Sequence, residues 1–496
     1  MQHLDRNTEP ANFASTGYCV PSESGDAGKR AANATGSRKL SGGLKQRHVV
    51  MLSIGGSIGA GLFVGSGHAI AEAGPAAVLA YVFASLLVVM VMRMLGEMAC
   101  AMPDSGSFST YADKAIGPWA GFTIGWMYWW FWVLVVPLEA TAAANILNGW
   151  LPQVPVWELS LLVTAVLTVA NLASVKNYGE LEFWFAIIKV TGILIFIGCG
   201  IAAMSGWIPS VHLTPWRTLT EHGGFAPRGM APIAGALLTT MFTFLGTEVV
   251  TIAAAESENP AREIGRAITS VVWRISLFYI GSILVIICVI PWNDPDLTRL
   301  GAYQAVLRVF HVPYARVITD CLILVAVGSC LNSALYTASR MMYSLGTRIQ
   351  APSFVTRTTS SGVPANAVIA SSCVAFLACA SNYLAPKYVF DALLATTGAI
   401  ALLVYLVITV SQLRLHRTLA AEGHLKVKMW LHPFLGMVVV ALIAGAFAVM
   451  LCSEDHRREV VATLGCSAAL AAFGYVRQQR RRVKAHVAGA GVAGGT

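Results

Sequence analysis

Long apolar segments dominate this sequence and constrain what it can fold into. Each is close to the roughly 20 residues that a helix needs to cross a hydrocarbon core about 30 Å thick. Of the 496 residues, 56% are hydrophobic and only 12% are Asp, Glu, Lys or Arg, about half the charged share of an ordinary soluble domain. Runs such as residues 193–203 do not alternate apolar and polar positions as a membrane β-strand would. The sequence therefore predicts an all-α membrane protein.

Hydropathy predicts twelve transmembrane helices. They cover residues 49–69, 75–98, 119–147, 159–173, 183–204, 230–255, 268–290, 315–345, 365–381, 389–412, 429–452 and 460–476. An even number of crossings leaves both termini on the same side of the membrane.

Lysine and arginine predict the orientation, because they resist translocation and collect on the cytoplasmic side. The N-terminal segment carries seven, the C-terminal segment five and the loop after the tenth span four, against eight in all six loops of the opposite side. We therefore predict a multi-pass protein of the cell inner (cytoplasmic) membrane with both termini in the cytoplasm. The net charge of +9 follows mostly from this topology, so no nucleic-acid partner is expected, whereas some attraction of the two tails to anionic membrane lipid is.

The predicted organisation has three parts. Residues 1–43 are polar and lack the apolar region of a signal peptide, so they are predicted to be a disordered cytoplasmic tail. Residues 44–476 form the transmembrane domain, and residues 477–496 form a basic cytoplasmic tail. The ten cysteines form no CxxC pair, so we expect no disulfide framework, no metal site and no cofactor.

Glycines interrupt the first span at Gly55, Gly56, Gly59 and Gly61. Glycine at this density lets a helix open, and the backbone N–H groups freed at the start of a half-helix can hold a carboxylate. The alternative is that these glycines are contacts that let helices pack closely, without a ligand. A dinucleotide-binding loop is excluded, because its glycines follow a strand and open a helix.

The sixth span carries a possible counterpart, with Gly246 and Glu248 in an otherwise apolar run. Spans one and six are five apart, so a repeat of five helices would be inverted across the membrane. In transporters of that design, two broken helices face each other at the midplane and form the binding site. Sequence identity between the two halves does not demonstrate the repeat.

Lys189 lies about 9 Å below the cytoplasmic end of the fifth span, at 1.5 Å per residue. Its side chain either extends back to the lipid headgroups or faces the helix bundle, where it could gain and lose a proton during a transport cycle. Physical reasoning alone leaves both open.

Other polar groups at depth have simpler interpretations. Glu248 is a substrate ligand, a proton carrier or, as we favour, a structural hydrogen-bond acceptor beside the broken helix. Glu139 is interpreted as an interfacial residue, because charge costs less near the interface. Asn332 and Ser333 are expected to form hydrogen bonds between helices. A tryptophan-rich patch is expected to pack against lipid or neighbouring helices; it comprises Trp126, Trp129, Trp130 and Trp132.

Several stretches carry a resemblance to a known family. They are the first span through Gly65 and Ser66, the segments 97–112, 128–135, 174–180 and 253–260, and the segment 332–340. Over residues 44–476 the chain resembles the amino acid transporter family of the amino acid–polyamine–organocation superfamily, and within it the bacterial 4-aminobutyrate (GABA) permeases.

The resemblance implies a leucine-transporter-like fold of two inverted five-helix repeats, at about residues 49–204 and 230–412, with two extra helices at 429–476. It implies import of a small-molecule amino acid, 4-aminobutyrate, by proton symport, with Lys189 as the proton-coupling residue. The substrate carboxylate would meet Ser57, Ile58, Gly59, Ala60 and Gly61. The amine would meet the broken sixth span, at Phe242, Phe244, Leu245, Gly246 and Glu248.

Other functions stay open at this stage. The chain could be a permease or exchanger for an aromatic, basic or proline substrate without net proton coupling, or a substrate-sensing receptor. An intramembrane enzyme is disfavoured, because no nucleophile-and-base pair recurs at helix spacing. No GxxxxGK[ST] loop occurs, which disfavours ATP-driven transport, and no obligate protein partner is indicated.

Overall fold

The computed structural model describes residues 44–208, 211, 213–257, 259–384, 389–452 and 454–493, and within these ranges all extended regular structure is helical. The first half contains α2 (Gln46–Gly55), η1 (Gly61–Gly65), α3 (Ser66–Ala73), η2 (Gly74–Ala76), α4 (Ala77–Ala101), α5 (Ser107–Ala115), α6 (Pro118–Trp150), α7 (Val156–Ala173), α8 (Val175–Met204) and α9 (Pro215–Thr220). The second half contains α10 (Ala231–Phe244), α11 (Val249–Ala254), α12 (Pro260–Val289), α13 (Asp296–Arg299), α14 (Ala302–Val309), α15 (Ala315–Thr347), η3 (Ser353–Thr356), α16 (Ala365–Leu384), α17 (Val389–Ala421), α18 (Phe434–Cys452) and α19 (Glu454–Ala493). The predicted tail at residues 1–43 lies outside the described residues.

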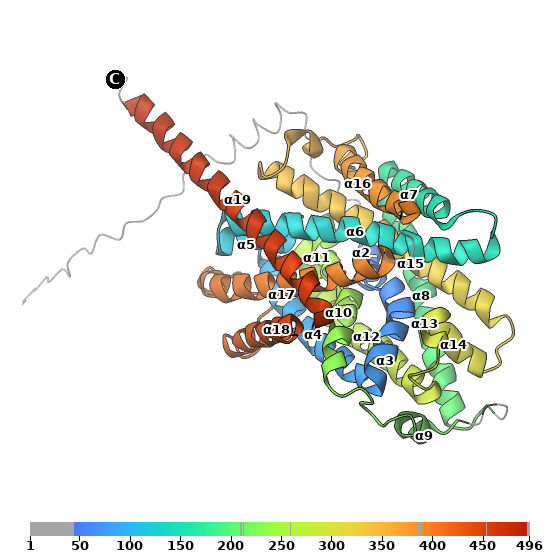
Figure 1. Ribbon diagram of the computed structural model, residues 1–496. Coiled ribbons are helices and arrows are strands. Elements are labelled where there is room, and N and C mark those ends of the chain that lie inside the picture. The colour runs from blue at the N-terminus through green and yellow to red at the C-terminus, as the bar shows by residue number, and fades with distance from the viewer. Residues whose placement is uncertain are drawn as a thin grey trace, which may run out of the picture. The chain divides into compact units, whose positions relative to one another are not determined.

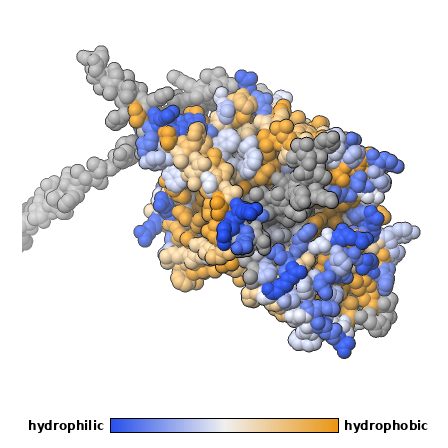
Figure 2. Space-filling view, in the orientation of Figure 1, coloured by the Kyte–Doolittle hydropathy of each residue, from blue (hydrophilic) through white to orange (hydrophobic). Residues whose placement is uncertain are grey.

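Helix α7 illustrates how a bilayer reverses the usual pattern of burial. Leu162, Val166 and Val169 are 58–67% exposed along one stripe, where the solvent would be hydrocarbon. The opposite stripe buries polar groups: the Thr168 hydroxyl donates to Ser372 Oγ at 3.1 Å, and Asn171 Nδ2 donates to Asn332 Oδ1 at 2.6 Å. Polar bonds between helices and apolar side chains outside are typical of membrane proteins, and Figure 2 shows broad apolar areas on the face in view.

Within the part of the chain that the structure describes, eight helical stretches are long and apolar enough to span a membrane, and two more apolar helices are shorter. The helices follow the predicted spans in order, and the first and sixth predicted spans are each divided. The first comprises α2, η1 and α3, and the sixth comprises α10 and α11. Helix α6 packs along α15 and is crossed by α19 (Figure 1).

Some bounds differ from the prediction. Helix α12 begins at Pro260, eight residues before the predicted span, because its first turns are amphipathic and charged and so escape a hydropathy window. Helix α19 continues past Val476 through the basic segment to Ala493. The short helices α5, α9, α13 and α14 were not predicted, since they are too short or too polar to resemble a span.

Two glycines of α8 give a test of this packing. A Cβ at Gly200 would lie 2.7 Å from Val285 Cγ2 of α12, whereas at Gly198 it would meet nothing within 4 Å. We expect Gly200→Ala to lower stability by about 1–3 kcal/mol through overpacking. Gly198→Ala should be neutral or slightly stabilising, since alanine favours helix.

Thermal unfolding of the purified variants in one detergent checks this expectation. Equal midpoints for the two variants would contradict the packing of α8 on α12.

Candidate functional site

Side chains of α8 and α6 stabilise the first interruption. Helix α2 ends at Gly55, the π-helical turn η1 begins at Gly61, and the α-helix α3 begins at Ser66. The Lys189 ammonium donates to the Ile58 carbonyl at 2.9 Å, and the Ala60 N–H donates to both carboxylate oxygens of Glu139 at 3.1 Å. Lys189 and Glu139 are buried. Backbone groups freed inside the protein are thus satisfied by ionisable side chains.

The second interruption contains its own acceptor. Helix α10 ends at Phe244 and α11 begins at Val249, with Gly246 at a φ of 112°, a conformation that side chains disfavour. The Gly246 N–H donates to Glu248 Oε1 and Oε2 at 3.1 and 3.0 Å, and the Tyr128 hydroxyl donates to Oε1 at 2.7 Å. In this conformation Glu248 stabilises the break, which is the structural role favoured from the sequence.

The two interruptions touch each other. A Cβ on Gly246 would lie 2.7 Å from the Gly56 carbonyl oxygen, so only glycine allows this approach. The Tyr279 hydroxyl of α12 lies 2.7 Å from the Ser57 carbonyl oxygen and 3.0 Å from that of Thr243. Tyr279 therefore joins both breaks through one hydroxyl group.

A small buried cavity lies beside the two breaks. It is lined by Ser57, Gly59, Gly61, Phe131, Trp132, Val135, Glu139, Thr243, Leu245 and Cys330. Its volume of about 10 Å³ is room for about one water molecule, far less than an amino acid needs. A substrate can enter only if the lining side chains or the half-helices move.

A larger vestibule lies farther along the same helices. Its volume is about 550 Å³, and its lining includes Val64, Ala142 and Ile323. These residues are three, three and seven positions from Gly61, Glu139 and Cys330 of the cavity, so the vestibule begins about one to two helical turns away.

A buried ion pair lies toward the other ends of α11 and α15. Arg340 Nε lies 3.1 Å from Glu256 Oε1, and both side chains are at most 2% exposed. The Arg340 guanidinium covers the Tyr336 ring at 3.9 Å, and Tyr336 stacks on Tyr178 at 4.3 Å. The pair and the rings fill the space between α8, α11 and α15 at this end.

Glu182, on the same helix as Lys189, forms a further group of buried hydrogen bonds. Its carboxylate accepts from Ser329 Oγ at 2.6 Å and from Asn332 Nδ2 at 2.9 Å, and it is fully buried. Asn332 and Ser333 form hydrogen bonds between helices as predicted, the latter with Tyr178. Glu182 was missed, although its spacing of seven residues from Lys189 places both on one face of α8.

The predicted site residues separate into groups. Ser57, Gly59, Gly61 and Leu245 line the cavity, and Ile58 and Ala60 contribute backbone groups to the first interruption. Phe244, Gly246 and Glu248 are not among the cavity-lining residues; Gly246 and Glu248 belong to the second interruption. The Phe242 side chain lies outside the described residues. Gly59 also serves close packing, since a Cβ there would lie 2.5 Å from Glu139 Oε1, so the two interpretations of the glycines are compatible.

The structure decides one open alternative, on Lys189, and contradicts one expectation, on Glu139. Lys189 does not extend to the headgroups, because it is fully buried on the Ile58 carbonyl. Glu139 is not interfacial: it is 1% exposed and holds the Ala60 N–H. A carboxylate beside an interrupted helix is stabilised by freed N–H groups, which an argument from membrane depth alone does not consider.

The tryptophan patch contains one further cavity residue. Trp130 is 42% exposed and Trp129 Nε1 donates to Ser371 Oγ at 3.0 Å, consistent with packing. Trp132, however, is buried and lines the cavity. The spacing of Trp132, Val135 and Glu139 by three and then four residues, on one helix face, was the signal that could have identified it.

Two interrupted helices that meet at a buried cavity, with a vestibule beyond it, define a membrane transporter. Residues 48–475 match the family described as amino acid permease, and the chain belongs to this family. It is a transporter and not an enzyme.

Similar proteins agree with this assignment. The chain is 58% identical over 426 residues to a probable GABA permease of Pseudomonas aeruginosa, covering 86% of this chain and 90% of that one. It is 56% identical over 426 residues to the gamma-aminobutyric acid permease of Escherichia coli, covering 86% and 91%. A manganese transporter of Eremococcus coleocola aligns with a TM-score of 0.55 at 15% identity over 88% and 94% of the two chains, a likeness in fold alone.

Tyr279→Phe tests the contact between the breaks. Tyr279→Phe removes the one O–H that lies between two buried carbonyls, at a cost of about 1–3 kcal/mol, so we expect amino acid uptake into proteoliposomes to fall about tenfold or more. Tyr303→Phe is the matched control, because it loses a 2.7 Å bond to Ser282 Oγ that touches neither break. Equal losses in both variants would refute a special role for Tyr279.

Proposed function

We propose that this protein imports 4-aminobutyrate across the inner membrane by alternating access, in symport with protons. The observation that carries the mechanism is the contact of the two interrupted helices beside a buried cavity. The substrate is supported by the relatives of 56–58% identity, whose names state that they are GABA permeases.

In the proposed binding mode, the substrate carboxylate meets the backbone N–H groups of residues 57–61 and the amine meets carbonyls of residues 242–245. The Ala60 N–H already holds Glu139, so the substrate carboxylate would compete with that side chain or use neighbouring N–H groups. Substrate entry would then also displace Trp132 or Leu245, since the cavity holds about one water molecule.

We further propose twelve membrane crossings arranged as two inverted five-helix repeats plus two helices, with both termini in the cytoplasm. The order of the helices and the excess of Lys and Arg on the terminal side support this topology. In this orientation the vestibule faces outward, and the buried pair of Arg340 and Glu256 closes the cytoplasmic side. Import would require the pair to separate.

Lys189 is the proposed proton-coupling residue. Its ammonium is a charge-assisted donor to the Ile58 carbonyl, and such bonds are about twice as strong as neutral ones. Loss of its proton would weaken the hold on the first interruption. A proton arriving or leaving would therefore shift the balance between conformations of the site.

Lys189→Ala should abolish uptake driven by a proton gradient while the protein still reaches the membrane, because the Ile58 carbonyl loses its charged donor. Lys176→Ala is the matched control, since Lys176 is an exposed lysine of the same helix. Accumulation by Lys189→Ala at the wild-type level would remove Lys189 from the coupling mechanism.

The proposed function is tested by uptake of labelled 4-aminobutyrate into liposomes containing the purified protein, with and without an inward proton gradient. We expect gradient-driven accumulation that unlabelled 4-aminobutyrate and close analogues block, and that proline, phenylalanine, lysine and arginine do not. Uptake that ignores the gradient would indicate an exchanger, and stronger competition by an α-amino acid would indicate another substrate.

A further inference from the structure

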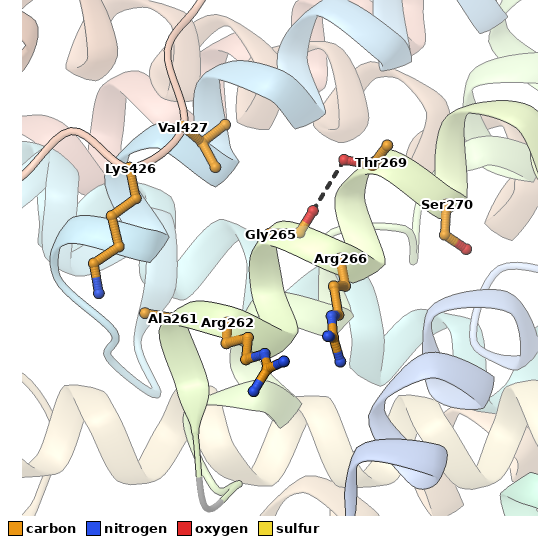
Figure 3. A pocket seen from close by; sticks show the side chains of 8 residues that line it. All are labelled: Ala261, Arg262, Gly265, Arg266, Thr269, Ser270, Lys426 and Val427. Carbon is orange, nitrogen blue, oxygen red and sulfur yellow. Dashed lines mark hydrogen bonds between the residues drawn. The ribbon is translucent and has the colours of Figure 1, made fainter.

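A basic pocket lies at the first turns of α12, outside the transport site. Its volume is about 790 Å³, and it is formed by α12 together with the segment between α17 and α18. Arg262, Arg266, Thr269 and Ser270 contribute from α12, and Lys426 contributes from the segment (Figure 3). The arginines project from the same side of the helix in this view.

No carboxylate of the described residues neutralises the positive charge of the pocket. Among the described residues, Arg262, Arg266 and Lys426 form no ion pair with a carboxylate. Arginines four residues apart on one helix face repel each other, so an anion between them would be stabilising. The buried Ser270 hydroxyl oxygen also has no hydrogen-bond partner within the described structure. Three cations and an unpaired hydroxyl suit a phosphate group.

Neighbouring side chains place this pocket at a membrane interface. Trp430 and Leu431 follow Lys426 in the same segment and are 51% and 73% exposed. Arg93 lies over the Trp430 ring at 5.0 Å and donates to the Lys428 carbonyl at 3.0 Å, which fixes the segment against α4. Exposed tryptophan beside basic residues is typical of the headgroup level of a bilayer.

The face of α12 that lines the pocket continues as an apolar stripe. Leu277 and Leu284 follow Arg266 by 11 and 18 residues, which returns each to nearly the same side of an α-helix. They are 54% and 45% exposed. Leu277 lies about 16 Å along the axis from Arg266, close to the roughly 15 Å of hydrocarbon in one leaflet. A soluble phosphate has no apolar part to pack on this stripe, whereas a lipid has an acyl chain.

We propose that this pocket binds the phosphate headgroup of an anionic phospholipid, with one acyl chain along Leu277. Arg262, Arg266 and Lys426 contact the phosphate oxygens, and Ser270 donates to one of them. In the orientation proposed above, the site lies in the cytoplasmic leaflet. Because α12 also carries Tyr279, the lipid braces the helix that joins the two breaks.

The test compares binding of phosphatidylglycerol and phosphatidylcholine to the purified full-length protein, by native mass spectrometry and by titration in detergent. The variant R262Q/R266Q/K426Q should bind phosphatidylglycerol roughly 100-fold more weakly, because each basic residue near an anionic lipid contributes roughly fivefold. The matched control is K114Q/R417Q/R480Q, which removes three exposed cations elsewhere and should bind like the wild type. Equal losses in both variants, or no preference of the wild type for phosphatidylglycerol, would overturn the proposal.

A second pair of variants distinguishes a lipid from a soluble anion. Leu277→Asn should weaken lipid binding by several-fold, whereas Leu162→Asn, on the exposed stripe of α7, should leave it unchanged. Inorganic phosphate and glycerol phosphate should compete only weakly. Competition at equal concentration, together with no effect of Leu277→Asn, would identify a soluble phosphate compound as the ligand and refute the lipid. Binding is measured without transport, so failure of the proposed uptake activity leaves this test intact.

Discussion

The structure depends on satisfying backbone groups where two helices stop inside the hydrocarbon. A lipid environment offers no water to replace the missing bonds, and each unpaired group would cost several kcal/mol. Lys189 and Tyr279 donate to the carbonyls of the first break, and Glu139 accepts from its N–H. Glu248 accepts from the second break. Because these side chains come from α6, α8, α12 and the sixth span itself, the packing of the bundle is tied to the two interruptions.

Ionisable side chains at the two interruptions couple protonation to the backbone conformation. A neutral side chain could supply a hydrogen bond, but only an ionisable one changes its strength when a proton arrives or leaves. The Glu139 carboxylate accepts from the Ala60 N–H, which is also a donor for the substrate carboxylate in the proposed binding mode. Lys189 donates to the nearby Ile58 carbonyl. Substrate and proton would therefore act on the same few backbone atoms. The lipid proposed at the first turns of α12 would contact the same helix that carries Tyr279.

Much of this architecture follows from the sequence, and the exceptions share a physical reason. Glycine density indicated the first interruption as one of two open interpretations, and Gly246 with Glu248 marked the sixth span as its possible counterpart. Burial of Lys189 was one of two open possibilities. Tyr279, Glu182 and the true position of Glu139 were missed, because their partners lie 222, 147 and 79 residues away, and hydropathy carries no information on which helix faces meet. From the sequence alone, Tyr279 cannot be distinguished from an aromatic residue that only packs in an apolar span.

The most direct measurement is an experimental structure of the protein in lipid nanodiscs with saturating 4-aminobutyrate. The account predicts ligand density between the two interruptions, with its carboxylate within hydrogen-bond distance of the backbone N–H groups of residues 57–61 and its amine facing carbonyls of residues 242–245. Density confined to the vestibule, with Glu139 still on Ala60 and the cavity unchanged, would contradict the account.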